Sequence, residues 1–298
     1  MPLTSTTVKK KGTDQPGKLY VVATPIGNPD DITLRAIRIL GEVDFIAAED
    51  TRKTGELLSY HNIKGNMISC HEHNEMSRSD NLIEKIKSGA TVALVSDAGT
   101  PSVSDPGYRM VNAALENSIQ VIPVPGASAA VSALSVSGLP TDAFVFIGFL
   151  PKKAQKRREQ LTRLAGETGT LVFYESPRRV LQLIHDIIDT LGDRTGVLSR
   201  EMTKSYEEFI RGPMSELAGI IEKRKGVKGE CTLLVSGKAP YKKAPFEDQW
   251  KAMEKDINRI TAGQEIAPSA LAREIAKEYK LPRHKVYDKL LSIKKEKQ

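Results

Sequence analysis

The sequence VALVSDAGTP, residues 92–101, decides the fold of this chain. Its first four residues are apolar and typical of a buried strand, which ends abruptly at Ser96 and Asp97. A turn of small residues follows, and Gly99 in that turn lets the backbone approach a ligand closely. In a parallel α/β sheet, ligands bind outside the carboxyl ends of the strands, where the chain turns toward a helix. The stretch therefore predicts a ligand-binding strand end.

A helix is expected directly after this turn. The sequence Ser104-Asp105-Pro106-Gly107 precedes a helical pattern of apolar residues. Asp is a favoured helix N-cap, and Pro is favoured at the first helical position. We therefore expect Asp105 to cap this helix and Pro106 to open it.

Similar strand-turn-helix units surround the central stretch. Apolar runs at 19–23, 44–48 and 121–124 predict further strands. Polar or glycine-proline turns follow four of the predicted strands, at 24–29, 49–53, 97–101 and 125–130. This alternation predicts an α/β sheet with its functional site along one edge.

The second half of the chain has a more hairpin-like pattern. Strands are predicted at 144–149, 171–174 and 231–236, and residues 195–210 predict two adjacent strands. Three helices are expected near the C-terminus, at 248–261, 268–279 and 282–294, and they resemble a helix-turn-helix. The predicted segments are a disordered tail at 1–17, α/β domains at 18–138 and 139–237, a linker at 238–247 and a helical domain at 248–298.

The composition excludes several classes of protein. The two cysteines form no C-x-x-C pair, which argues against a disulfide framework or a structural zinc site and fits a reducing cytoplasm. His71 and His73 have no further residues at metal-ligand spacing, so we expect no metal. No apolar stretch reaches membrane-spanning length. The formal net charge of +7 permits a nucleic-acid partner but does not establish one.

The first predicted strand lacks the usual nucleotide-binding loops. The turn Thr24-Pro25-Ile26-Gly27-Asn28 stands where a dinucleotide fold would carry G-x-G-x-x-G, and no G-K-[ST] loop is present. NAD and ATP are therefore disfavoured as cofactors.

Nine motifs in order give a specific resemblance. They are 23–28 (ATPIGN), 47–52 (AAEDTR), 71–75 (HEHNE), 96–101 (SDAGTP), 105–107 (DPG), 125–126 (PG), 148–151 (GFLP), 173–176 (FYES) and 200–204 (REMTK). The chain resembles the bacterial small-subunit rRNA cytidine 2′-O-methyltransferases of the tetrapyrrole methylase superfamily. The resemblance covers about residues 18–237, and the helical tail is similar to the small C-terminal domain of that family.

The resemblance implies two α/β domains of the tetrapyrrole methylase type, with S-adenosylmethionine in the cleft between them, in a homodimer. Many tetrapyrrole-directed members have a glycine-rich first turn. The residues from Pro25 to Asn28 replace it here, which favours the RNA branch. The implied cofactor-binding residues are Pro25, Asp97, Ala98, Gly99, Thr100, Pro101, Gly126, Ala127, Ser128, Phe149 and Leu150.

The implied reaction is attack of a ribose 2′-oxygen on the sulfonium methyl group. Alignment of the reacting atoms is the main task of the protein, and a general base would accept the hydroxyl proton. The candidate bases are Glu49, Asp50, His73 and Glu175. Structural roles stay open, because Glu49 and Asp50 are also suited to capping the following helix, and His73 to bonding within its loop.

Basic residues provide candidates for RNA binding, because phosphate contacts dominate RNA affinity. A charge run is equally consistent with a solvated helix face. The candidates are Arg52, Lys53, Lys152, Lys153, Arg157, Arg158, Arg178, Arg200 and Lys204.

The leading hypothesis is an S-adenosylmethionine-dependent methyltransferase acting on a cytidine ribose in the decoding centre of 16S rRNA, in the cytoplasm. One alternative is a superfamily methylase acting on a tetrapyrrole or a protein. Another is a non-catalytic nucleic-acid-binding regulator that uses the C-terminal helices. The polar or glycine-proline turns after four predicted strands are hard to explain in such a protein.

Overall fold

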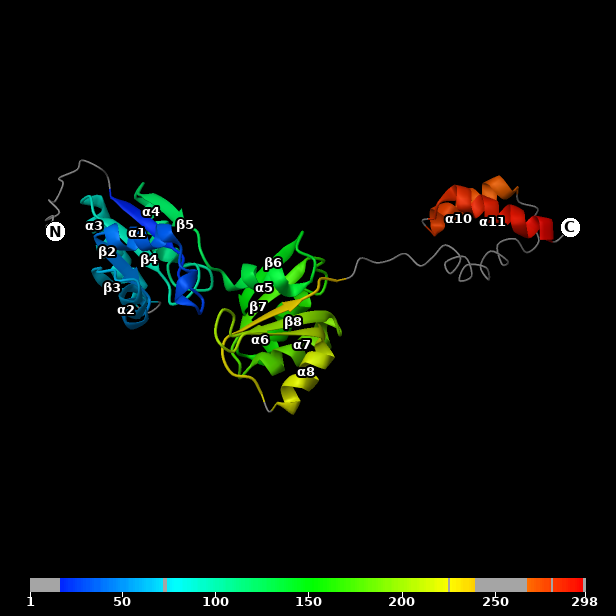
Figure 1. Ribbon diagram of the computed structural model, residues 1–298. Coiled ribbons are helices and arrows are strands. Elements are labelled where there is room, and N and C mark those ends of the chain that lie inside the picture. The colour runs from blue at the N-terminus through cyan, green and yellow to red at the C-terminus, as the bar shows by residue number, and fades with distance from the viewer. Residues whose placement is uncertain (1–16, 72–73, 225, 239–266, 280, 297–298) are drawn as a thin grey trace, which may run out of the picture. The chain divides into compact units, whose positions relative to one another are not determined.

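The computed structural model describes residues 17–71, 74–224, 226–238, 267–279 and 281–296 (Figure 1). The chain divides into two compact units, Met1–Ala239 and Pro240–Gln298. The division falls inside the predicted linker. The tail at 1–16 and the helix predicted at 248–261 lie outside the described residues.

The first sheet is wholly parallel, and its strands lie in the order β3-β2-β4-β1-β5. Ala48 pairs with Val95, and Val22 pairs with Val124, so the carboxyl ends of four strands lie along one edge. The elements are β1 (Lys18–Val22), the 3₁₀ helix η1 (Pro29–Asp31), α1 (Leu34–Glu42), β2 (Phe45–Ala48), α2 (Thr51–Tyr60), β3 (Met67–Ser69), α3 (Glu75–Lys87), β4 (Thr91–Val95), α4 (Tyr108–Glu116) and β5 (Gln120–Val124).

Strand β4 is buried on both faces, as its apolar run predicts. Val92 and Leu94 pack with the apolar residues of α3 and α4. Ala93 and Val95 point to the opposite face and pack with those of α1 and α2. Because successive side chains of a strand alternate between faces, a continuous apolar run suits a strand covered on both sides.

The second sheet is mixed, in the order β6-β7-β10-β8-β9, which confirms the hairpin character of this half. Only β6 and β7 are parallel; the other three pairs are antiparallel. The carboxyl ends of β6, β7 and β8 therefore share an edge with the start of β10. The elements are α5 (Ala129–Ser137), β6 (Phe144–Phe149), α6 (Ala154–Arg163), β7 (Thr170–Glu175), α7 (Val180–Leu191), β8 (Thr195–Arg200), β9 (Glu208–Pro213), α8 (Met214–Lys223) and β10 (Cys231–Val235).

Helix α5 belongs to the second sheet, although the predicted boundary at 138 assigns it to the first domain. Ala133 and Leu134 pack against Val172 and Leu234 of that sheet, and Figure 1 shows the helix over it. The exchange between sheets therefore occurs in the turn at 125–128. A helix that crosses to another sheet carries the same apolar pattern as one that stays, so the sequence did not reveal the earlier boundary.

Two of the three predicted C-terminal helices lie among the described residues. They are α10 (Pro268–Glu278) and α11 (Arg283–Glu296), and their apolar faces pack together through Leu271, Ile275 and Val286. Pro268 occupies the first turn of α10, where its missing N–H has no cost. None of the helices in the described part of the chain is long and apolar enough to cross a membrane.

One of the basic residues predicted to bind RNA, Arg157 on α6, is buried. Arg157 is 5% exposed, and its Nε lies 2.6 Å from Oδ2 of Asp186, a fully buried residue of α7. Arg158 donates to the other oxygen of the same carboxylate at 2.8 Å. Burial raises the pKa of Asp186, but the hydrogen bonds from Arg158 and Arg157 outweigh it and leave the pKa below its usual value. The prediction that Arg157 binds RNA is therefore wrong.

We expect Asp186→Ala to lower the free energy of unfolding by about 3–5 kcal/mol, because it leaves the guanidinium of Arg157 buried without a partner. Asp189→Ala is the matched control on the same helix. Asp189 is 63% exposed and 3.7 Å from Arg158, so its loss should cost less than about 1 kcal/mol. Urea denaturation followed by circular dichroism measures both, and equal losses would contradict this assignment.

Candidate functional site

The turns after β1 and β4 are joined by backbone hydrogen bonds. The N–H of Thr24 donates to the carbonyl of Gly99 at 2.8 Å, and the N–H of Gly99 donates back at 3.0 Å. Oγ1 of Thr24 also donates to the carbonyl of Ser96 at 3.1 Å. Gly99 has φ +80°, which glycine adopts without the strain that a side chain would bring. The predicted need for glycine at this strand end is thus explained.

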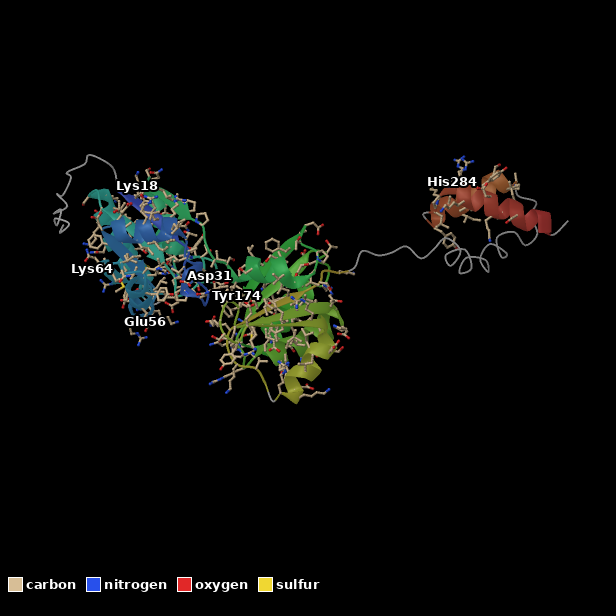
Figure 2. The ribbon with its side chains drawn as sticks, in the orientation of Figure 1. Lys18, Asp31, Glu56, Lys64, Tyr174 and His284 are labelled. Carbon is tan, nitrogen blue, oxygen red and sulfur yellow. The ribbon has the colours of Figure 1, made fainter. Side chains whose placement is uncertain are left out.

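The turn after β5 is tied to the same structure. Oγ1 of Thr100 donates to the carbonyl of Ala127 at 3.3 Å. The hydroxyl of Tyr174, on β7, accepts from the N–H of Ala130 at 3.1 Å, and this links the start of α5 to the second sheet (Figure 2). Three strand ends of the first sheet and one strand of the second are therefore connected.

The loop after β1 also contacts the second domain. The N–H of Asn28 donates to Oγ1 of Thr203 at 2.9 Å. A Cβ added at Gly27 would lie 2.7 Å from the carbonyl oxygen of Met202, so only glycine allows this approach. Ile26, on the same loop, packs into the core of the second domain.

A cavity of about 350 Å³ opens where these strand ends meet. The first sheet contributes loop residues, and the second contributes the ends of β6 and β7 and the start of β10. The lining residues are Ile26, Ala98, Gly99, Thr100, Val103, Asp105, Ser128, Ala129, Phe149, Tyr174, Glu175, Ser176, Pro177, Glu230, Cys231 and Thr232.

The cavity contains about half of the predicted cofactor-binding residues. Those that line it are Ala98, Gly99, Thr100, Ser128 and Phe149. Others belong to the same turns without reaching the lining, namely Pro25, Asp97, Pro101, Gly126 and Ala127.

The side chain of Leu150 does not reach the cavity. Its side chain is 3% exposed and packs in the core beneath the second sheet, while the neighbouring Phe149 is 56% exposed and lines the cavity. Two adjacent residues at a strand end point to opposite sides, so a dipeptide motif cannot place both in one site.

Asp97 ties two strand ends together. Its carboxylate accepts from the N–H of Asp50 at 3.0 Å and from Nζ of Lys53 at 2.8 Å. Its own N–H donates to Glu49 at 3.2 Å. Burial raises the pKa of Glu49, and the nearby charge of Asp97 adds to that effect, against the hydrogen bond from Asp97 N–H. Asp97 and Lys53 therefore hold the ends of β2 and β4 in register.

Two other candidate bases are engaged in structural roles. Asp50 is the N-cap of α2, and its carboxylate accepts from the backbone and guanidinium of Arg52, which hold its pKa well below the usual range. Glu175 is 3% exposed and pairs with Arg179 at 2.5 Å. His73 lies outside the described residues.

Helix α4 begins differently from our expectation. It starts at Tyr108 with Gly107 as the N-cap, two residues later than predicted. Oε1 of Glu75, at the start of α3, accepts from the N–H groups of Gly107 and Arg109, each at 3.0 Å. A carboxylate from 32 residues upstream thus replaces the expected cap. No local signal in the sequence reveals such a contact.

Asp105 is therefore free of the capping role and lines the cavity. Burial raises its pKa to about 6, and the negative charges of Glu49 and Asp97 add to that effect, against a hydrogen bond from Ser96. Sequence reasoning missed this residue as a functional candidate because its Asp-Pro-Gly context is typical of a helix start.

The remaining basic candidates form two groups. Within the described residues, Lys152, Lys153 and Arg178 are exposed and form no ion pair. The others pair with carboxylates at 2.7–3.3 Å and are Arg52, Lys53, Arg158, Arg200 and Lys204. No group of three or more potential metal ligands is present in the part of the chain that the structure describes.

Comparison with known proteins decides the family. A profile of the tetrapyrrole (corrin/porphyrin) methylases matches residues 18–218. Ribosomal RNA small subunit methyltransferase I of Halalkalibacterium halodurans is 48% identical over 240 residues, which are 80% of this chain and 82% of that protein. The chain belongs to the ribosomal RNA small subunit methyltransferase I group of the tetrapyrrole methylase family. This confirms the family predicted from the nine motifs.

Further members of the family support the assignment. The protein of the same name from Synechocystis is 42% identical and aligns over 93% of this chain and 98% of its own. A crystal structure of uroporphyrin-III C-methyltransferase from Thermus thermophilus, complexed with S-adenosylhomocysteine, has a TM-score of 0.54 at 19% identity and covers 74% of this chain and 97% of that one. This likeness confirms the two-sheet fold.

S-adenosylmethionine is the cofactor of methyltransferases in this family, and the cavity has the chemistry to hold it. Ile26, Phe149 and Tyr174 give the cavity an apolar surface of the kind that suits an adenine ring. Gly99 brings no side chain into the cavity, which leaves room for a ligand against the backbone, and Ser128 adds a hydroxyl. An apolar slot with a few placed polar groups is the usual form of a nucleotide-like site.

We expect Phe149→Ala to weaken S-adenosylmethionine binding roughly 5- to 150-fold, because stacking of a base on an aromatic side chain contributes about 1–3 kcal/mol. Phe144→Ala is the matched control: Phe144 is 44% exposed, begins the same strand and does not line the cavity. Isothermal titration calorimetry measures both. A greater loss for Phe144→Ala would refute the placement.

Gly27→Ala should force the turn after β1 away from the loop at Met202, and this overpacking should lower the free energy of unfolding by about 1–3 kcal/mol. It should also weaken cofactor binding. Gly219→Ala on α8 has open space around the new methyl group and serves as the control. Calorimetry should give wild-type affinity for Gly219→Ala and a reduced one for Gly27→Ala. Unchanged affinity for Gly27→Ala would mean that this approach of the two domains does not shape the site.

Proposed function

We propose that the chain transfers a methyl group from S-adenosylmethionine to the ribose 2′-hydroxyl of a cytidine in the decoding centre of 16S rRNA. The observation that carries the proposal is the cavity at the joined strand ends, in a chain 48% identical to a protein named ribosomal RNA small subunit methyltransferase I. That name supports the substrate class, and the resemblance of the motifs supports the cytidine ribose.

The described residues are suited to an alignment mechanism. S-adenosylmethionine supplies an electrophilic methyl group on a sulfonium. The hydrogen-bonded turns at Thr24, Gly99 and Thr100 form a fixed wall, so binding costs little rearrangement. Phe149 and Tyr174, with ring centroids 5.7 Å apart, form an apolar wall on the opposite side.

The exposed basic residues support an RNA substrate. Lys152 and Lys153 follow the carboxyl end of β6, and Arg178 follows that of β7, the same sheet edge that lines the cavity. Unpaired cations beside the site are available to contact phosphates of the target strand. A ribosomal substrate also places the reaction in the cytoplasm.

We further propose a homodimer, as the family resemblance implies. Val131 and Val136 on α5 and Phe144 on β6 leave large apolar groups exposed, at 56%, 48% and 44%. A second copy of the chain would cover such groups. Sedimentation equilibrium should give twice the mass of the chain.

The function is tested with methyl-labelled S-adenosylmethionine and small ribosomal subunits from cells that lack this gene. We expect label in 16S rRNA and one new 2′-O-methylcytidine in the decoding centre. Label in a tetrapyrrole or protein, but not in subunits or naked rRNA, would favour the other methylases of the superfamily. Deletion of residues 248–298 tests the alternative of a non-catalytic nucleic-acid-binding regulator. A regulator would lose all function on this deletion, whereas the enzyme should keep cofactor binding.

We expect Lys152→Glu to weaken subunit binding several-fold and to reduce the slope of log affinity against log salt by about one, as for a lost phosphate contact. Lys64→Glu is the control, because Lys64 is exposed before β3, at the amino end of the first sheet (Figure 2). Filter binding at several salt concentrations measures both. Equal salt slopes for the two variants would remove Lys152 from the RNA-binding surface.

A further inference from the structure

Asp105 stands at a wall shared by two cavities. One is the cofactor cavity, and the other, of about 300 Å³, lies beside it against the start of α4. Among the residues that the structure describes, Asp105 is the one that lines both. The second cavity is lined by Glu75, Ser104, Asp105, Pro106, Gly107, Tyr108 and Arg109.

Within the described part of the chain, the carboxylate of Asp105 differs from the others at the cavity because it has no cationic partner. Of the described carboxylates that line the cofactor cavity, Glu175 pairs with Arg179 and Glu230 pairs with Lys204. No ion pair with Asp105 is formed within the described residues. An unpaired carboxylate is available to accept a proton.

The surroundings of Asp105 also favour proton uptake. The groups near it are Ser96 and Asp97 at the end of β4, Glu49 after β2, and Tyr174 on β7. Two of these are further carboxylates, and Lys53 is already paired with Asp97. Burial and these negative charges raise the pKa of Asp105 to about 6, which suits a base working near neutral pH.

Glu75 fixes the segment that carries Asp105. Its buried carboxylate accepts from the N–H of Gly107, two residues beyond Asp105, and from that of Arg109. The bonds hold the loop against α3. Asp105 is therefore held between the two cavities by a contact that does not use its own carboxylate.

We propose that Asp105 is the general base of the reaction, and that the target ribose reaches it from the second cavity. The inference rests on the proposed function. As the 2′-oxygen forms its bond to the methyl carbon, the carbon–sulfur bond breaks and its electron pair stays on sulfur. The hydroxyl proton passes to the carboxylate of Asp105, which becomes a neutral acid and later releases the proton to solvent.

The second cavity suits this role, because it is separate from the cofactor cavity and Asp105 lines both. Tyr108, beside it, is 67% exposed, and such an aromatic ring provides a face on which a base can stack. Polar groups from Ser104 and Arg109 complete the lining.

The test measures single-turnover methylation of small subunits from pH 5 to 8 by wild type, Asp105→Asn and Glu49→Gln, all at saturating cofactor. The wild-type rate should rise with pH through about 6 and then level, because the base must be deprotonated. Asp105→Asn should lose about 100-fold or more in rate and lose this rise. Its affinity for S-adenosylhomocysteine should stay within about threefold of wild type by calorimetry.

Glu49→Gln is the discriminating variant. It removes a negative charge that raises the pKa of Asp105, so its rate should still rise with pH, but at a lower pH than in wild type. If Glu49 is the base instead, Glu49→Gln abolishes the rise and Asp105→Asn keeps it, which overturns the proposal.

Weakened cofactor binding with an unchanged rate in Asp105→Asn likewise overturns it, in favour of a cofactor-binding role. An inactive wild type overturns the proposed function and this inference together, whereas an active Asp105→Asn overturns the inference alone.

Discussion

The paired backbone hydrogen bonds between Thr24 and Gly99 are the interaction on which the site depends. They join the turns of two neighbouring strands, β1 and β4, and the hydroxyl of Thr100 extends the connection to the turn after β5. Gly99 has φ +80° where these bonds form, a conformation that glycine adopts without strain, which explains the glycine in the motif. Three strand ends thereby form one wall of the cavity, and the second sheet supplies the other.

Charge near the site is used mainly for structure. Asp97 holds two strand ends, Asp50 caps a helix, and Glu175 is neutralised by Arg179. Each of these carboxylates is engaged by hydrogen bonds or an ion pair within the fold. Asp105 differs because a distant residue, Glu75, performs the capping that its own sequence context predicts for it. Because Glu75 caps α4, the half-buried carboxylate of Asp105 stays beside the cofactor cavity without a capping role.

Sequence reasoning succeeded where local pattern and structure coincide. The run at 92–95 predicted a buried strand, which the structure covers on both faces. The turn after it, predicted to bind a ligand, lines the cavity. Sequence reasoning failed where contacts between residues far apart in the chain determine whether a side chain is buried or exposed. Arg157 and Lys152 belong to one charge run, yet Arg157 is buried against Asp186 and Lys152 is exposed. Leu150 and Phe149 belong to one motif, yet only Phe149 reaches the cavity. Helix α5 and the cap of α4 likewise depend on contacts with elements far away in the chain.

The most direct test of the account is a crystal structure of the chain with S-adenosylhomocysteine. We predict density for the ligand between the turn at Gly99 and the ring of Phe149, with the carboxylate of Asp105 on the side where the transferred methyl group would project from sulfur, open toward the second cavity. Ligand density at another surface, with this cavity filled by its own side chains, would contradict the account.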